Sequence, residues 1–412
     1  MPTLAEYHHA GYISAAETAR RLGIKQATLY AYVSRGQLQA HRPNDARVSM
    51  FHPDEVHRLQ ARPARAVRPE LSIPSAVTLI RPDGPCYRGV DVISLATTHT
   101  YEQVAELLWH GTAGSSQTWQ TLEAAEAGIA EKQALPADAL PIEKLQAAVA
   151  LMAPADLLRY DVTAAAVLRV APGLITAMAA SLTTSVQTAN SPPGQPSQPL
   201  AAAMSARLSA RLPTAALTGA VSAAMILLAD HELAASTVAV RIAAAARSPI
   251  YACIAAGLGV LQGPWHGGTS LRAEDLLAQI RSPEQADAII HAHLSRGDQL
   301  WGFGHPLYSN GDPRAAVLLR LILGSAPARQ RSTINRILSF AAENSLPPPN
   351  IDFALAALAY CWSLSRGAGQ AIFAVARTAG WIAHAIEEYE RKTSYRIRAT
   401  YTGPPYQDRR ED

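Results

Sequence analysis

Apolar side chains recur along most of this chain at the spacing of an α-helix. Beyond residue 72, segments rich in alanine and leucine, such as "TYEQVAELLWHG" (100–111) and "LTGAVSAAMILLADHELAASTVAVRIAAAA" (217–246), place hydrophobic positions one helical turn apart. Near residues 76–92, β-branched residues flank a Pro-Asp-Gly turn, which predicts short strands. The pattern therefore predicts a mainly α fold with a few short strands.

The first sixty residues follow a different and more punctuated pattern. Ser14 and Glu17 have the spacing of a capping box, which satisfies free N–H groups at a helix start. A second short helix places Leu29 and Val33 on one side, and "LQAHR" and "RVSMF" around "PNDA" predict a hairpin before a third helix, "HPDEVHRLQAR". This order resembles the small winged helix-turn-helix domains of the excisionase and mercury-resistance-regulator type, across residues 11–60.

That resemblance implies a DNA-binding surface, and charge is consistent with it. The whole chain has a net charge of +3, and residues 1–62 hold eight Lys/Arg against five Asp/Glu. A helix-turn-helix domain reads base edges from the start of its second helix and contacts phosphates with basic side chains. The candidate DNA-binding residues are Lys25, Gln26, Thr28, Tyr30 and Arg35, on a basic face that also includes Arg20, Arg21, Arg42 and Arg47. The alternative is an inherited domain that now mediates assembly.

Composition narrows the class of protein. With 412 residues, 49% of them hydrophobic and 17% charged, the chain buries a large core, which excludes a disordered protein. The three cysteines are too few and too scattered for a disulfide framework. The N-terminus lacks the basic and apolar regions of a signal peptide, and the apolar run at 250–261 is too short to span a bilayer. We therefore expect a soluble, cytoplasmic protein.

The stretch "RPARAVRPELS" separates the two patterns. It is rich in proline and arginine and has no periodicity, as is typical of an exposed linker. We expect a helix-turn-helix domain at 1–62, a linker at 63–72 and a helical domain at 73–412.

Four segments of the helical domain differ from the apolar helices that form its core. Each places polar side chains beside glycines or at helix ends. They are "DHELAAST" (230–237), "GPWHGGTS" (263–270), "WGFGHPLYSNGDPR" (301–314) and "NIDF" (350–353). Together with "YRGVDV", "EQVAELLWHG" and the tail "ATYTGPP", they resemble the citrate synthase family over residues 73–406. The resemblance implies an all-helical fold whose small part (266–358) closes over a keto-acid bound to a large part (73–265 and 359–412).

The chemistry of such a family agrees with these residue types. Joining a thioester to a keto-acid needs a base for a weakly acidic proton, donors to an enol or enolate oxygen, and cations for carboxylates. The resemblance implies that Asp352 is the base and that His266 donates to the enol oxygen. It also implies that His305 binds the keto carbonyl of oxaloacetate and that His231 binds the same substrate.

Three arginines complete the set that the resemblance implies. Arg314 and Arg377 match residues that bind carboxylates, for which a guanidinium fork is well shaped. Arg396 matches an arginine that reaches into the partner's site, which implies a homodimer. Acetyl-CoA or a short acyl-CoA would be a cosubstrate, with no permanently bound cofactor. No metal site is expected, because His291 and His293 lack a third ligand nearby.

Departures from the family pattern leave alternatives open. Pro306 and Ser309 replace two basic residues of the loop near the coenzyme A phosphates, and Ala354, Leu355 and Ala356 replace the usual residues after the base. One hypothesis is a citrate synthase-like enzyme with a DNA-binding N-terminal domain. The others are a metabolite-sensing transcriptional regulator and a 2-methylcitrate synthase.

Overall fold

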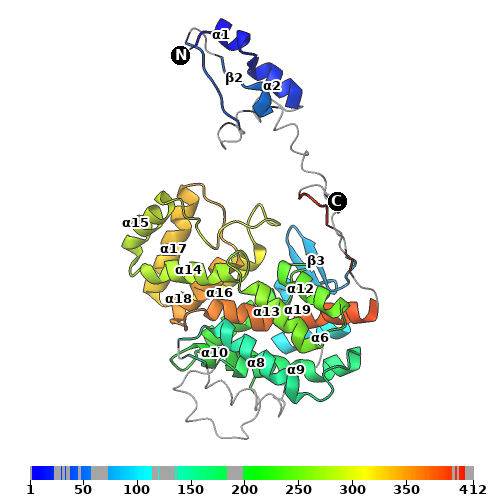
Figure 1. Ribbon diagram of the computed structural model, residues 1–412. Helices are drawn as coiled ribbons and strands as arrows, with labels where there is room; N and C mark the ends of the chain where they lie inside the picture. The colour runs from blue at the N-terminus through cyan, green and yellow to red at the C-terminus, as the bar shows by residue number, and fades with distance from the viewer. Residues whose placement is uncertain are drawn as a thin grey trace, which may run out of the picture. The chain divides into compact units, whose positions relative to one another are not determined.

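The chain divides into two compact units, Met1–Pro74 and Ser75–Asp412, in a computed structural model (Figure 1). The structure describes residues 2–22, 29, 33, 38–44, 48–56, 73–113, 119, 135–136, 138–182, 198–391, 395–396 and 399–403.

The first unit is small and has its own core. Its elements are α1 (Leu4–His9), β1 (Ile13–Ser14), α2 (Ala15–Leu22) and β2 (Met50–Phe51). β1 pairs with β2 in antiparallel register, and an isolated bridge joins His41 to Met50. The Ser14 side chain accepts a hydrogen bond from the Glu17 N–H at 3.3 Å, as the capping pattern predicted. The buried core consists of Ala15, Ala19, Leu29, Leu38, Phe51 and Val56.

The basic face predicted for this unit is described only in part. Lys25, Gln26, Thr28, Tyr30, Arg35 and Arg47 lie outside the described residues. On α2, Arg20 and Arg21 both form ion pairs with Glu17. Arg42 is exposed.

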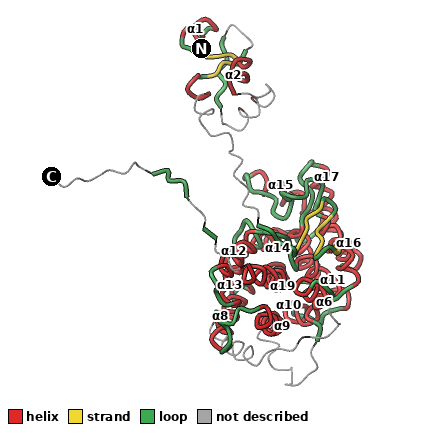
Figure 2. The backbone as a smooth tube through the Cα atoms, turned by 90° about the vertical axis from the view of Figure 1, so that its right-hand side faces the viewer, coloured by secondary structure: helices red, strands yellow, loops and turns green. Residues whose placement is uncertain are grey.

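The second unit is mainly helical, as the hydrophobic spacing predicted (Figure 2). Its helices are α5 (Val92–Thr98), α6 (Tyr101–His110), α8 (Pro141–Ala155), α9 (Ala164–Ala180), α10 (Leu200–Leu208), α11 (Ala215–Leu228), α12 (Ala235–Ala245), α13 (Ile250–Leu261), α14 (Gly268–Gln279), α15 (Pro283–Ser295), α16 (Pro313–Ser325), α17 (Ala328–Glu343), α18 (Ile351–Trp362) and α19 (Ala368–Arg391). Among the described helices, none is long and apolar enough to cross a membrane.

A three-stranded sheet lies at the start of this unit, around the predicted Pro-Asp-Gly turn. β3 (Thr78–Arg81), β4 (Gly84–Tyr87) and β5 (Val90–Asp91) form an antiparallel meander. The Tyr87 hydroxyl lies 3.0 Å from the backbone nitrogen of Asp230 and 2.9 Å from its carbonyl oxygen. The sheet therefore fixes the turn that follows α11.

Helix α19 lies at the centre of the unit and is buried on nearly every side over most of its length. It packs against α6, α8, α9, α11, α12, α13, α14 and α18. Gly257 of α13 allows a close approach, since a Cβ there would lie 2.9 Å from the Trp381 ring. Polar side chains on α19 are consequently held by partners in the core.

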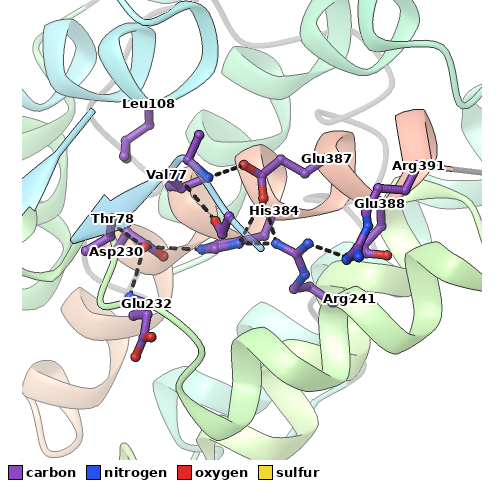
Figure 3. A network of polar contacts seen from close by, with 12 residues as sticks. Val77, Thr78, Leu108, Asp230, Glu232, Arg241, His384, Glu387, Glu388 and Arg391 are labelled. Atoms are coloured by element: carbon purple, nitrogen blue, oxygen red, sulfur yellow. Dashed lines mark hydrogen bonds and ion pairs between the residues drawn. The ribbon is translucent and has the colours of Figure 1, made fainter. Parts of the chain in front are cut away.

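One such group forms a buried network of charges (Figure 3). The Arg241 Nη1 atom of α12 lies 2.7 Å from Glu387 Oε2 and 2.7 Å from His384 Nδ1, and Nη2 pairs with Glu388. Because Arg241 can only donate, His384 Nδ1 accepts and its Nε2 donates to Asp230 Oδ2 at 3.3 Å. The network thus joins α12, α19 and the residue before His231.

Candidate active site

A pocket of about 440 Å³ opens in the second unit where several helix ends meet. Six of the seven substrate-site residues predicted from the sequence line it: His231, His266, His305, Arg314, Asp352 and Arg377. The seventh, Arg396, does not line this pocket and is exposed in the described part of the C-terminal segment. Segments more than a hundred residues apart in sequence therefore meet around one cavity.

Asp352 lies in the first turn of α18, which Asn350 caps. The Asn350 side-chain oxygen accepts from the Asp352 N–H at 2.9 Å, and its amide nitrogen donates to the Gly304 carbonyl at 2.7 Å. Burial raises the pKa of the Asp352 carboxyl to about 7. Its Oδ1 atom is buried with no hydrogen-bond partner among the described residues. This carboxyl can therefore gain or lose a proton near neutral pH.

The Gly-x-Gly before His305 brings its loop onto the start of α18. Gly302 has φ = 85°, and a Cβ there would lie 2.8 Å from the backbone nitrogen of Phe353. The Leu307 N–H donates to His305 Nδ1 at 3.1 Å, and His305 Nε2 lies 3.4 Å from Arg314 Nη2. Burial, followed by the charge of Arg314, lowers the pKa of His305 to about 4. His305 is consequently uncharged at pH 7.

His231 and His266 are buried in the same way. His231 Nε2 lies 2.9 Å from the Tyr308 hydroxyl, and burial, followed by Arg314 and Arg377, holds the pKa of His231 well below its usual range. His266 Nε2 lies 2.7 Å from the Ser236 hydroxyl, and burial lowers the pKa of His266 to about 4. All three histidines of the pocket are thus uncharged at neutral pH.

Two buried guanidinium groups supply the positive charge of the pocket. Arg314 is 2% exposed and forms two hydrogen bonds with the Asp312 carboxylate, at 3.0 and 2.8 Å. Arg377 is 1% exposed and donates to the Leu228 carbonyl at 2.7 Å. Its Nη1 atom has no partner among the described residues. Arg314 is already paired with Asp312, whereas Arg377 has a buried N–H group that a ligand oxygen could accept from.

Several supporting residues were not predicted. Tyr308, Asp312, Asn350 and Ser236 each hold one of the predicted side chains or its loop. Asp312 and Asn350 lie two positions before Arg314 and Asp352 in the same motifs. Their closeness in sequence could have indicated that they support those residues. Tyr308 and Ser236 contact histidines that are distant in sequence.

Of the departures noted in the sequence, Ala354, Leu355 and Ala356 are buried in α18, whereas the two in the loop after His305 lie at the surface. Pro306 and Ser309 are exposed. Nearby, the Arg272 guanidinium lies over the Trp301 ring, 4.6 Å from its centroid.

The fold and pocket define a helical enzyme whose site holds two buried guanidinium groups, a carboxyl that titrates near neutral pH and three uncharged histidines. The sequence matches the family described as "Citrate synthase, C-terminal domain" over residues 68–399. The chain therefore belongs to the citrate synthase family and is a condensing acyltransferase of the citrate synthase type. Enzymes of this family act on coenzyme A substrates without a permanently bound cofactor.

Relatives with two different names cover most of the chain. "Citrate synthase 2" of Bacillus subtilis is 29% identical over 368 residues, which is 83% of this chain and 96% of that protein. "2-methylcitrate synthase" of Mycobacterium tuberculosis is 28% identical over 335 residues, or 77% of this chain and 84% of that one.

Solved structures share the fold. Citrate synthase from Pyrobaculum aerophilum is 25% identical with a TM-score of 0.67, covering 82% of this chain and 92% of that one. The Thermoplasma acidophilum enzyme, in ternary complex with carboxymethyl coenzyme A and oxaloacetate, is 24% identical with a TM-score of 0.67, covering 82% of this chain and 96% of that one.

Proposed function

We propose that the pocket condenses an acyl-CoA, acetyl-CoA in the first instance, with oxaloacetate. The observation that carries the proposal is the Asp352 carboxyl, whose pKa is raised to about 7 and whose Oδ1 has no partner, in one pocket with Arg314 and Arg377. A base with a pKa near the working pH is suited to a weakly acidic carbon. Two buried cations match the two carboxylates of oxaloacetate.

Each residue has a distinct part in the proposed reaction. Asp352 takes a proton from the α-carbon of the thioester while His266 donates a hydrogen bond to the oxygen of the enolate that forms. The enolate carbon then forms a bond to the keto carbon of oxaloacetate, as His305 and His231 bind that substrate and His305 stabilises the resulting alkoxide. The alkoxide gains a proton, and water cleaves the thioester to release citrate and coenzyme A.

The proposal includes closure and a dimer. The small part (266–358) would close against the large part (73–265 and 359–412) and exclude water from the enolate. Arg396 lies outside the pocket of its own chain and is exposed, which suits an arginine that completes the site of a second subunit.

The length of the acyl chain is a separate question, because relatives carry both names. We propose acetyl-CoA as the preferred substrate and propionyl-CoA, which would give 2-methylcitrate, as the alternative. The ratio of kcat/KM for the two thioesters decides between them.

Release of coenzyme A from acetyl-CoA and oxaloacetate by the purified protein tests the activity. The Asp352→Ala variant should lose ~10²–10⁴-fold in turnover. Calorimetry should show nearly unchanged oxaloacetate binding, because the arginines hold the carboxylates. Near-normal turnover by the variant would remove Asp352 from the mechanism.

We further propose that residues 1–62 of the first unit, followed by the linker (63–72), form a helix-turn-helix domain that binds DNA. Its separate core and the pairing of β1 with β2 support a small autonomous domain. Fluorescence anisotropy with a mixed-sequence duplex at low and high salt tests this, since phosphate contacts weaken as salt rises. Tight DNA and oxaloacetate binding without any acyl-CoA binding would favour the sensory regulator over the enzyme.

A further inference from the structure

A second cavity, which the proposed reaction does not use, lies at the opposite end of the helices that carry the pocket. It has a volume of about 510 Å³ and is lined by residues of α14, α17 and α18 and of the turn before α19. We call it the α14–α18 groove. Its volume is within the range of sites that hold small organic ligands.

The floor of the groove is apolar and its rim is cationic. We call its buried residues Ile280 and Ala359 the floor and its exposed residues Arg281, Arg329 and Arg366 the rim; Ala278, which also lines the groove, is exposed. Tyr360 closes one side, with its hydroxyl donating to the Ile280 carbonyl at 3.0 Å. Such a surface suits a ligand with a hydrophobic body and a negatively charged group.

The acidic residues of the groove are already occupied by other partners. Asp275 forms a bidentate ion pair with Arg366, at 2.7 and 2.8 Å. Glu274 is 8% exposed, and its carboxyl oxygens accept from the N–H groups of Gly367 and Gly369 at 2.7 and 2.8 Å. Asp275 is therefore neutralised by Arg366, while burial raises the pKa of the hydrogen-bonded Glu274 carboxyl to about 7.

Two arginines of the rim, Arg281 and Arg329, can bind a ligand. Arg329 donates to the Arg281 backbone carbonyl oxygen, which holds the Arg329 side chain beside residue 281 at the groove. In the described part of the chain, no carboxylate forms an ion pair with either guanidinium. The charge of Arg329 contributes only a minor part of the lowering of the Glu284 pKa on α15. Two arginines without a carboxylate partner, lining one groove with apolar residues, match a phosphate or carboxylate on a small organic body.

The groove is also connected to the pocket through three helices. His266 lies just before α14, Asp352 is in the first turn of α18 and Arg377 is on α19. Each of these helices, or the turn leading into it, also contributes to the groove or binds Glu274. A ligand that draws α14 and α18 together would therefore move groups on opposite sides of the pocket relative to each other.

We propose that the α14–α18 groove binds a small organic anion and that its occupancy changes the turnover of the condensing site. The second part rests on the proposed function, whereas the first does not. Phenyl phosphate, which has an aromatic body and one phosphate, is a suitable probe. Inorganic phosphate and benzyl alcohol test the charge and the apolar body separately.

Binding to the full-length protein is measured by calorimetry. Phenyl phosphate should bind more tightly than inorganic phosphate or benzyl alcohol, and the Arg281→Gln/Arg329→Gln double variant should weaken it at least tenfold. Arg320→Gln, an exposed arginine on α16 outside both cavities, is the matched control and should leave binding unchanged. Ala278→Phe should block the groove without altering the charge.

Absence of binding to the wild type, or equal binding by the double variant, would overturn the groove as a site. If the Arg377→Gln variant loses binding instead, the probe binds in the active-site pocket, and this result would also overturn the groove as a site. In turnover assays, phenyl phosphate should change the wild-type rate but not that of the double variant; binding without such a change would overturn the coupling. A protein that binds the probe but has no condensing activity would refute the proposed function and leave the site standing.

Discussion

The Asp312 carboxylate and the Arg314 guanidinium form a buried ion pair that also reaches the start of α18. Asp312 accepts from Arg314 Nε at 3.0 Å and from Nη2 at 2.8 Å. The same carboxylate accepts from the backbone N–H of Ile351 at 3.0 Å, one residue before Asp352. The Asp312 side chain therefore positions both Arg314, proposed to bind the keto-acid, and the first turn of α18, which carries the proposed base Asp352.

The first prediction concerns this shared support. Asp312→Asn keeps the shape of the side chain but weakens its hold on Arg314, so the KM for oxaloacetate should rise about tenfold, as expected for ~1.4 kcal/mol of lost binding. The KM for acyl-CoA should change little, which a purely structural defect would not produce. Steady-state kinetics with each substrate varied in turn measures the difference. Equal increases in both constants would show that Asp312 only maintains the fold.

The second prediction concerns pH. Because Asp352 must be ionised to act as a base and its pKa is about 7, kcat/KM should rise with pH through about 7. Its raised pKa in the folded state means that the native protein binds this proton more tightly than the unfolded chain does. The contribution of Asp352 to the free energy of unfolding therefore falls as pH rises from about 4 to about 7.

The Asp352→Asn variant isolates that contribution, since asparagine does not titrate. At pH 8 the variant should be more stable than the wild type by roughly 4 kcal/mol, at ~1.4 kcal/mol for each of about three pKa units between 3.8 and about 7. The difference should narrow toward pH 5. Denaturant unfolding at both pH values measures it, with Asp298→Asn as the exposed control. A constant gap would mean that the Asp352 carboxyl does not titrate in this range.

The third prediction concerns Arg396 and a second subunit. Arg396→Ala and Asp352→Ala should each be nearly inactive as pure proteins. If Arg396 acts on the partner's site, a mixed dimer of the two variants has one site with both lesions and one intact site. Mixing after mild dissociation should therefore restore up to a quarter of wild-type activity, because about half of the dimers are mixed and each has one working site. No recovery would place Arg396 outside the partner's site.

The fourth prediction concerns the loop after His305, which is expected to lie near the phosphates of coenzyme A. If Pro306 and Ser309 leave the coenzyme A phosphates with fewer cations, Ser309→Lys should lower the KM for acyl-CoA several-fold at low salt. An exposed charge contact is worth only ~0.2–1 kcal/mol, and salt screens it. Ser325→Lys, also exposed, is the control for added charge. A wild-type KM that is already low would indicate that another basic residue, such as Arg272, has taken over.

Hydrophobic spacing predicted the helices of the second unit, and the Pro-Asp-Gly turn predicted the β3–β4 pair, because both signals are local. The pairing of β1 with β2 was not predicted, since two-residue strands carry no detectable alternation. Motif order indicated the six residues that meet at the pocket. The contact of Tyr308 with His231 depends on packing between segments far apart in sequence, for which a single sequence contains no signal.

The network around Arg241 has a consequence for how this unit comes apart. Its charges come from the turn after α11, α12 and the end of α19, and β3 adds the Thr78 hydroxyl, which donates to Asp230. Removing one partner from a buried pair of charges costs ~3–5 kcal/mol. If any one of these segments separates from the others, a buried charged or polar group loses its partner. Partial melting is thereby penalised at the centre of the molecule, and unfolding of the sheet, α12 and α19 is expected to occur as a single cooperative event.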